Sequence, residues 1–172
     1  MEHERCIACG FDGEHYDNDA LLEALRVLGL RWRVLIADAG AELRIRPETD
    51  VWSAIEYAAH SRDITALHAF GIEQALTVDE PRYPPIGDGL ISAAVADYAG
   101  ADPSEVVDEL ERQAQRIADL AADASPDAWF RGLTIGVERT EVRRLIEHGL
   151  HDSVHHLDDV ERGLTLLRAR PT

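Results

Sequence analysis

The residues best suited to chemistry in this chain gather between His148 and His156, where four histidines and one aspartate occur within nine positions. Apolar residues around them recur at helical spacing, and residues four apart on a helix lie on one face. Asp152 with His156 is one such pair, and His151 with His155 is another. Imidazole and carboxylate groups at this spacing can bind one divalent metal ion from a single helix.

The two pairs fall on different sides of the predicted helix. Its apolar stripe comprises Val142, Ile146, Gly149, Val160, Leu164 and Leu167. Asp152 and His156 flank this stripe, about 80° and about 40° from its centre, whereas His151 and His155 lie about 180° and about 220° away. We therefore expect Asp152 and His156 to flank the core, and His151 and His155 to face solvent.

A second predicted helix offers a further ligand, His60. It lies about 80° to one side of the apolar stripe of its own helix, where it can meet Asp152 and His156 across a bundle. Two imidazoles and one carboxylate hold a divalent ion and leave coordination positions open, as a catalytic site requires. Glu56 or Asp63, about one turn from His60, could bond its other ring nitrogen and fix its tautomer. A metal-free alternative stays open, in which His60 is a packed histidine beside the core.

The chain has two cysteines, Cys6 and Cys9, in a polar N-terminal segment. The pair resembles half of a zinc ribbon, and a closed zinc site needs four ligands. His3 and His15 are the histidines near enough in sequence to complete a local site. A redox-active pair is a second alternative. A simple turn that holds no metal is the interpretation we favour from sequence.

Four helices are expected to position these side chains. Hydrophobic periodicity places them at residues 19–39, 53–76, 102–124 and 140–168, after an N-terminal loop or knuckle over residues 1–18. Ser53 and Glu56 match a capping box at the second helix, and Asp102 followed by Pro103 starts the third. Four long helices with little strand content predict an all-α four-helix bundle over residues 19–172.

The connections carry weaker signals. Residues 44–47 break the first helix, and the proline-rich residues 81–89 predict a long loop that could cover a pocket. Residues 90–98 could add a helical turn or two. Residues 133–137 predict a short strand or an extended loop.

Composition excludes several classes of partner. The 172 residues suit one domain, and the net charge of −16 argues against nucleic acid or an anionic membrane. All 17 basic residues are arginine, so Schiff-base and phosphate-binding lysines are excluded. No apolar run approaches the roughly 20 residues of a membrane span, and the N-terminus has no hydrophobic signal segment. We expect a soluble, cytoplasmic protein.

Two motifs together resemble those of the DinB-like superfamily. They are W-S-x-x-E-x-x-x-H at residues 52–60 and H-D-x-x-H-H-L-x-D at residues 151–159. The superfamily includes the metal-binding N-terminal domain of mycothiol-dependent maleylpyruvate isomerase, and the resemblance covers residues 19–168. It implies an up-down-down-up four-helix bundle with one divalent ion, zinc or nickel, on His60, Asp152 and His156. The alternative register, His151 with His155, would give the three histidines that most members have.

The same resemblance suggests a function. It implies a metal-dependent thiol S-transferase, in which a low-molecular-weight thiol such as mycothiol is activated at the metal and transferred to an electrophile. A non-catalytic metal-binding stress-response bundle and a thiol-dependent isomerase are alternatives, and a homodimer is compatible with each. No phosphate-binding loop and no serine-nucleophile elbow occurs in the sequence.

Overall fold

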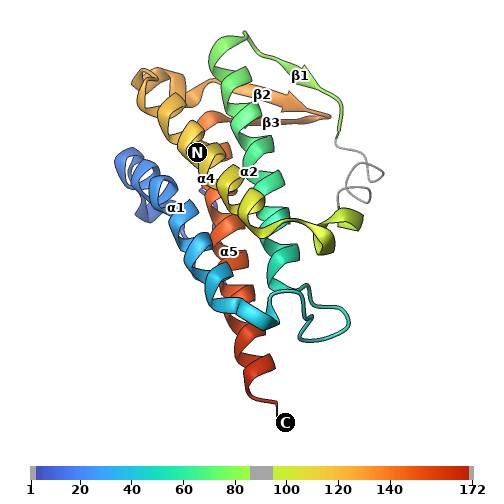
Figure 1. Ribbon diagram of the computed structural model, residues 1–172. Helices are drawn as coiled ribbons and strands as arrows, with labels where there is room; N and C mark the ends of the chain where they lie inside the picture. Colours follow the sequence, from blue (N-terminus) through green and yellow to red (C-terminus); the bar gives the residue numbers. More distant parts are fainter. Residues whose placement is uncertain (1–2, 86–94, 171–172) are drawn as a thin grey trace.

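Four long helices form the molecule, as expected from sequence, and the computed structural model describes residues 3–85 and 95–170 (Figure 1). The helices are α1 (Asn18–Ala39), α2 (Ala54–Thr77), α4 (Pro103–Ala122) and α5 (Val142–Arg168). In Figure 1, α1 and α5 run downward whereas α2 and α4 run upward. The predicted up-down-down-up bundle is therefore confirmed. Within the described ranges, no helix is both long and apolar enough to cross a membrane.

The order of neighbours decides which side chains can meet. Helix α2 packs mainly against α4 and α5, and α1 packs mainly against α4 and, less extensively, α5. Consecutive helices α1 and α2 touch little, so they lie diagonally across the bundle. The 3₁₀ turn Gly40–Glu42 and the loop after it make this diagonal connection. As a result, α2 faces α5, the helix that carries the histidine cluster.

Helix ends follow the local signals in the sequence. Asp17 caps α1, with its carboxylate accepting from the Ala20 amide at 2.8 Å. The capping box of Ser53 and Glu56 at α2 is present, and Asp102 with Pro103 starts α4 as predicted. The fourth helix begins two residues later than expected, at Val142, because a strand occupies the residues before it.

That strand belongs to a small sheet at the end of the bundle where α2 ends and α5 begins (Figure 1). Strand β2 (Gly132–Ile135) pairs antiparallel with β3 (Glu138–Glu141) and parallel with β1 (Arg82–Tyr83). Gly136 turns the hairpin with a φ of 62°, a conformation that favours glycine. The strand expected within residues 133–137 is thus confirmed at residues 133–135.

The expected 81–89 loop and the 90–98 helical turn fall partly outside the described residues. Of the loop, 86–89 lie outside, and the described part includes β1. Of the turn, 90–94 lie outside, whereas 95–97 are helical and continue into a 3₁₀ turn, Tyr98–Gly100.

A buried indole joins α1 to α5 in the core. Trp32 of α1 is fully buried, and its Nε1–H donates to the Ser153 hydroxyl of α5 at 2.7 Å. Ser153 is itself buried, and its hydroxyl accepts this hydrogen bond from the indole. The other large side chains that are fully buried in the same core are Leu21, Leu25, Leu28, Ile55, Ile72, Leu110, Ile117, Leu133, Ile146, Leu150 and Leu157.

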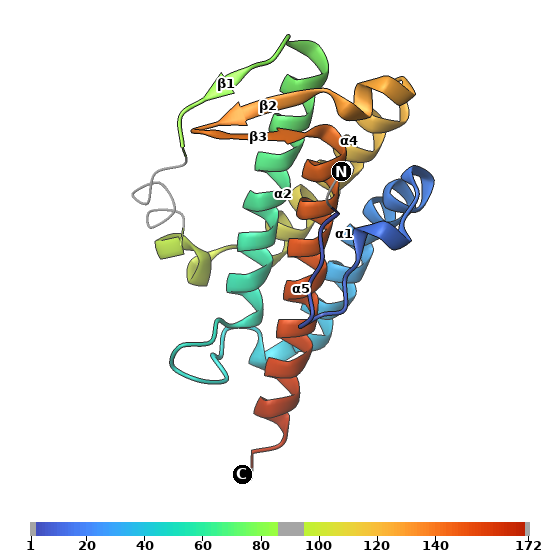
Figure 2. The same cartoon turned by 180° about the vertical axis from the view of Figure 1, so that it is seen from behind.

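The N-terminal segment covers the outer side of α5 (Figure 2). It folds back on itself through an antiparallel bridge between Arg5 and Asp12, with the Cys6 amide donating to the Phe11 carbonyl at 2.9 Å. Phe11 is buried, and its ring lies 5.2 Å from that of His151. The segment is thus packed onto the helix face that sequence patterning assigned to solvent.

Candidate metal centre

Helices α2 and α5 bring His60, Asp152 and His156 together, here called the α2–α5 cluster. The Nε2 atoms of His60 and His156 lie 3.8 and 3.7 Å from the Asp152 carboxylate. One ligand atom from each residue lies within 4.8 Å of the others. These distances are too long for hydrogen bonds. They resemble the separation of about 3.4 Å between two ligand atoms that are each about 2.1 Å from one tetrahedral ion.

The surroundings of Asp152 fit a cation. Its Oδ2 atom is buried and accepts no hydrogen bond from any described residue. Buried polar atoms normally have a partner, and an ion between the three side chains would supply one. All three side chains are about one-fifth exposed, so the cluster is open enough for an ion to enter.

Protonation in the cluster also suits metal binding. The Nδ1–H of His156 donates to Asp159 at 2.9 Å, which leaves Nε2 with its lone pair directed toward Asp152. Burial lowers the pKa of His156 despite the carboxylates beside it, so its ring is neutral near pH 7. Burial would raise the pKa of Asp152, but His60 and His156 beside it hold that pKa below its ordinary value. The His156 ring and the Asp152 carboxylate are therefore both in the form that binds a metal ion.

Aromatic side chains surround the cluster. Trp52 packs on His60 at 5.3 Å between ring centroids, and Tyr57 packs on His156 at 5.0 Å. Tyr98, which follows the 86–94 segment, lies 6.2 Å from His60. Burial, together with nearby carboxylates, raises the pKa of Tyr98 to about 12, so its phenol stays protonated. Tyr98 could not be identified from the sequence, because no periodicity connects it to α2.

Comparison with known proteins establishes the family. The sequence matches the DinB superfamily over residues 17–160, which is most of the chain. The chain belongs to the DinB superfamily. The resemblance inferred from the two motifs is therefore confirmed, and a search of curated proteins finds no match.

One solved structure resembles this DinB chain over nearly its whole length. It is YfiT from Bacillus subtilis, described as a probable metal-dependent hydrolase with an unusual four-helix bundle topology. The match has a TM-score of 0.77 and 16% identity, and it covers 97% of this chain and 94% of YfiT. At this identity the similarity demonstrates the shared fold.

The two carboxylates proposed to orient His60 have other roles in this DinB bundle. Glu56 accepts from the amide and hydroxyl of Ser53 at 2.9 and 2.6 Å and from Arg46, so the prediction that it bonds His60 is wrong. Asp63 accepts from Arg62 at 2.7 Å, and no hydrogen bond to His60 is found among the described residues. The carboxylate that orients a ligand of the cluster is Asp159 instead.

His151 and His155 do not face solvent, contrary to expectation, and they do not form the alternative register with His60. Their side chains are 15% and 28% exposed, and they contact the N-terminal segment. The expectation came from the position of each residue relative to the apolar stripe that faces the bundle core. That pattern carries no information about a polar segment packed on the opposite face of α5. Cys6 and Cys9 are the residues that these two histidines meet.

The structure does not bring His3 and His15, the candidates for a local site, to the cysteines. His3 lies 2.8 Å from Glu147, and His15 is exposed on a 3₁₀ turn. Another histidine that sequence analysis missed is His68 of α2, whose Nδ1–H donates to the Ile64 carbonyl at 2.8 Å. Gly149 makes room for it, since a Cβ there would lie 3.0 Å from the His68 ring.

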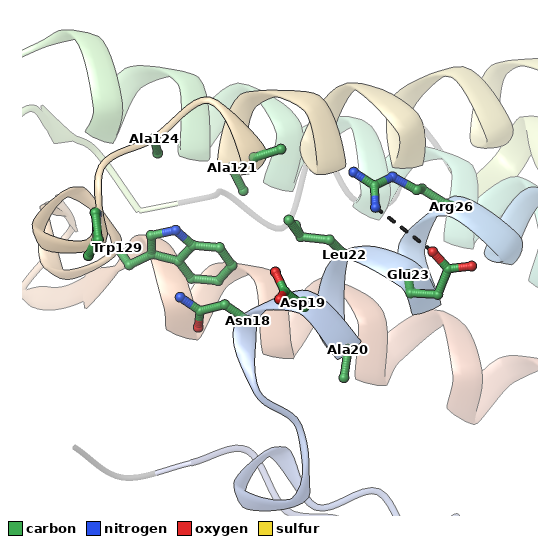
Figure 3. Close-up of a pocket in the computed structure, with 11 residues that line it drawn as sticks. Asn18, Asp19, Ala20, Leu22, Glu23, Arg26, Ala121, Ala124 and Trp129 are labelled. Atoms are coloured by element: carbon green, nitrogen blue, oxygen red, sulfur yellow. Dashed lines mark ion pairs between the residues drawn. The ribbon is translucent and has the colours of Figure 1, made fainter.

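A surface hollow lies elsewhere on the DinB bundle, between the start of α1 and the end of α4 (Figure 3). Its volume is about 610 Å³, and Leu22, Ala121 and Trp129 face it, with an ion pair of Glu23 and Arg26 at one side. None of its lining residues is a histidine or cysteine. The hollow therefore offers no chemistry comparable to that of the α2–α5 cluster.

Proposed function

We propose that this protein is a divalent-metal-dependent enzyme that activates a low-molecular-weight thiol, such as mycothiol, for transfer to an electrophile. The observation that carries the proposal is the α2–α5 cluster, with its half-buried donors and the Asp152 oxygen that no described residue bonds. Imidazole and carboxylate ligands suit zinc and nickel. Membership of the DinB superfamily supports a metal at this position.

The number of protein ligands supports a catalytic role for the ion. Three ligands leave at least one position of a tetrahedral ion for a substrate. An ion held there lowers the pKa of a coordinated thiol or water, and so supplies a nucleophile near neutral pH. Asp159 fixes the ring of His156, which keeps the donor set in place before substrate arrives.

The aromatic residues around the cluster support binding of an organic substrate. Trp52 and Tyr57 offer apolar faces beside the ligands, and the protonated phenol of Tyr98 can donate a hydrogen bond to a developing negative charge. Arginine, the sole basic side chain besides histidine in the sequence, can pair with a carboxylate of the thiol or the electrophile.

Hydrolysis is a second candidate, because the description of YfiT names a probable metal-dependent hydrolase of the same fold. In that case water replaces the thiol as the nucleophile, and the metal ion has the same three protein ligands. The two candidates differ in one measurable requirement, since a transferase needs the thiol as a second substrate and a hydrolase does not.

The metal site is tested first, on protein purified without a histidine tag. We expect His60→Ala to lose one metal ion per chain relative to the wild type. His15→Ala is the matched control, because His15 is exposed and lies outside every candidate ligand group among the described residues. Unchanged metal content in His60→Ala, with the helical circular dichroism intact, would reject the site.

The reaction is tested next with a panel of electrophiles, each incubated with and without thiol. Thiol consumption that requires protein, metal and electrophile, and that His60→Ala abolishes, supports the transferase. Electrophile loss that needs no thiol supports the hydrolase. Metal binding with neither activity would favour the non-catalytic alternative, and rearrangement of a maleyl-type acid with thiol recovered would favour the isomerase.

A further inference from the structure

A second group of metal-binding side chains lies on the other side of α5. Cys6 and Cys9 of the N-terminal segment meet His151 and His155 of α5, here called the N-terminal cluster. One ligand atom from each of the four residues lies within 4.8 Å of the others. The Cys6 sulfur is 3.6 Å from Nδ1 of His155. A sulfur about 2.3 Å and a nitrogen about 2.0 Å from one tetrahedral zinc ion are about 3.5 Å apart.

In each of the two histidines, one ring nitrogen is left available to bind a metal ion. Nδ1 of His151 donates to Glu4 at 3.1 Å, while its Nε2 atom is buried and has no hydrogen-bond partner among the described residues. Nε2 of His155 faces Asp159 at 3.6 Å, which leaves Nδ1 directed at Cys6. Each histidine thus has a carboxylate near one nitrogen and a free lone pair on the other, as metal-bound histidines usually do.

The loop that carries the cysteines is shaped to hold sulfur ligands. Gly10 follows Cys9 with a φ of 74°, a conformation that favours glycine, inside the fold-back closed by the bridge between Arg5 and Asp12. The backbone amides of Cys9 and Ala8 face the Cys6 sulfur and can donate hydrogen bonds to it. Phe11 lies over His151 and shields one side of the cluster from water.

We propose that Cys6, Cys9, His151 and His155 bind one zinc ion in a closed, structural Cys₂His₂ site that joins the N-terminal segment to α5. Two thiolates and two imidazoles in tetrahedral arrangement are a typical zinc donor set. Four protein ligands leave no position for substrate. This distinguishes the N-terminal cluster from the α2–α5 cluster, whose three ligands leave the ion open.

Another candidate set of metal ligands lies on the same face of α5, but its residues have other contacts. Glu4, His148 and His151 also offer ligand atoms within 4.8 Å of one another. Arg144 lies 2.7 Å from Glu4 and already balances its charge, and His148 is about half exposed. Glu4 therefore acts as the carboxylate that orients His151.

The proposed site would also support the α2–α5 cluster. Residues 151 and 155 belong to one cluster and residues 152 and 156 to the other, so a single stretch of α5 carries ligands for both. Asp159 lies beside His155 and bonds His156. Zinc at the N-terminal cluster would thus fix the rotation of α5 about its axis. The inference does not depend on the proposed function, because the two clusters share no ligand.

Cobalt and zinc loading of the full chain, kept reduced and without a histidine tag, tests the proposal. We expect one tightly bound zinc ion that a mercurial thiol-blocking reagent releases from the wild type. After exchange for Co²⁺, we expect thiolate-to-cobalt charge-transfer bands and the strong visible bands of a tetrahedral ion. His60→Ala should retain both signals, since it affects only the α2–α5 cluster.

Cys9→Ser and His155→Gln should each abolish the charge-transfer bands or shift them strongly, and lower zinc content by one ion per chain. Ile7→Ala is the matched control, because Ile7 lies between the cysteines and is fully exposed. Circular dichroism checks that each variant is folded, and the mercurial experiment needs no variant. No thiolate band in the reduced wild type, a Cys6–Cys9 disulfide that persists under reducing conditions, or a band unchanged in His155→Gln would each overturn the proposal.

Discussion

Glu56, in the first turn of α2, provides a quantitative test of how the sequence starts the helix that carries His60. Its carboxylate accepts from the amide and hydroxyl of Ser53 and from the guanidinium of Arg46, at 3.0 Å from Nε. The side chain is only 4% exposed. Burial would raise the pKa of Glu56, but the hydrogen bonds from Arg46 and Ser53 outweigh it and hold that pKa at about 2, against an ordinary value of 4.5.

Because the pKa of Glu56 is lower in the folded state, ionised Glu56 stabilises the folded protein at every pH at which it is charged. At about 1.4 kcal/mol for each pH unit, the displacement corresponds to about 3 kcal/mol. Arg46 is 44% exposed and its pairing is partly screened, so we expect about 2–3 kcal/mol. Because the folded pKa is lower than the unfolded one, this stabilisation is complete above pH 4.5. It decreases as the pH falls toward 2, and more than half is lost by about pH 3.

The perturbation is Glu56→Gln, which keeps the shape of the side chain and removes its charge. Urea unfolding followed by circular dichroism should give a free energy of unfolding about 2–3 kcal/mol below that of the wild type at pH 7. The difference between the two proteins should shrink steadily as the pH is lowered from 4.5 to 3. Glu48→Gln, on the exposed loop before α2, is the control and should show neither effect. A difference that stays constant between pH 7 and pH 3 would refute the reasoning.

Three further predictions concern packing and ligand orientation. Gly29→Ala should lower the free energy of unfolding in urea by about 1–3 kcal/mol or more, because a Cβ there would lie 2.7 Å from the Cα atom of Glu111 in α4. Gly100→Ala is the control and should cost less than about 0.5 kcal/mol, because a Cβ at Gly100 would have no atom within 4 Å. Ser153→Ala should cost about 1–3 kcal/mol by the same assay, since it leaves the indole N–H of Trp32 buried without its acceptor; a cost near zero would show that water replaces the hydroxyl. Asp159→Asn should weaken metal binding at the α2–α5 cluster about 10- to 100-fold in competitive chelator titrations, and unchanged affinity would contradict the orienting role.

The parts of this protein that could be predicted from sequence are those governed by local rules. Capping residues and apolar periodicity placed the helices within two residues at each start. The helical wheel also placed Asp152 and His156 beside the core and His60 where it could meet them. These inferences succeed because side-chain directions on a helix are fixed by a rotation of about 100° per residue.

The parts that could not be predicted depend on contacts between distant segments without periodicity. Glu4 and His151 are 147 positions apart, and no local pattern indicates that they meet. The same holds for Tyr98, which reaches His60 only because of the path that the chain takes between α2 and α4. At the cysteine pair the sequence favoured a simple turn over half of a zinc ribbon, and only the fold shows that His151 and His155 lie beside the two cysteines.

The histidine density of α5 follows from its position between two unlike partners. Successive residues on a helix diverge by about 100°, so the pairs 151/155 and 152/156 must address different neighbours. One pair faces α2, where His60 completes an open donor set, and the other faces the N-terminal segment, where two cysteines complete a closed one. An isolated bundle would need only the first pair. The second pair is half-buried beneath a polar segment that has few apolar residues to hold it in place. A metal ion bound there would attach this segment to α5 where hydrophobic contacts are few.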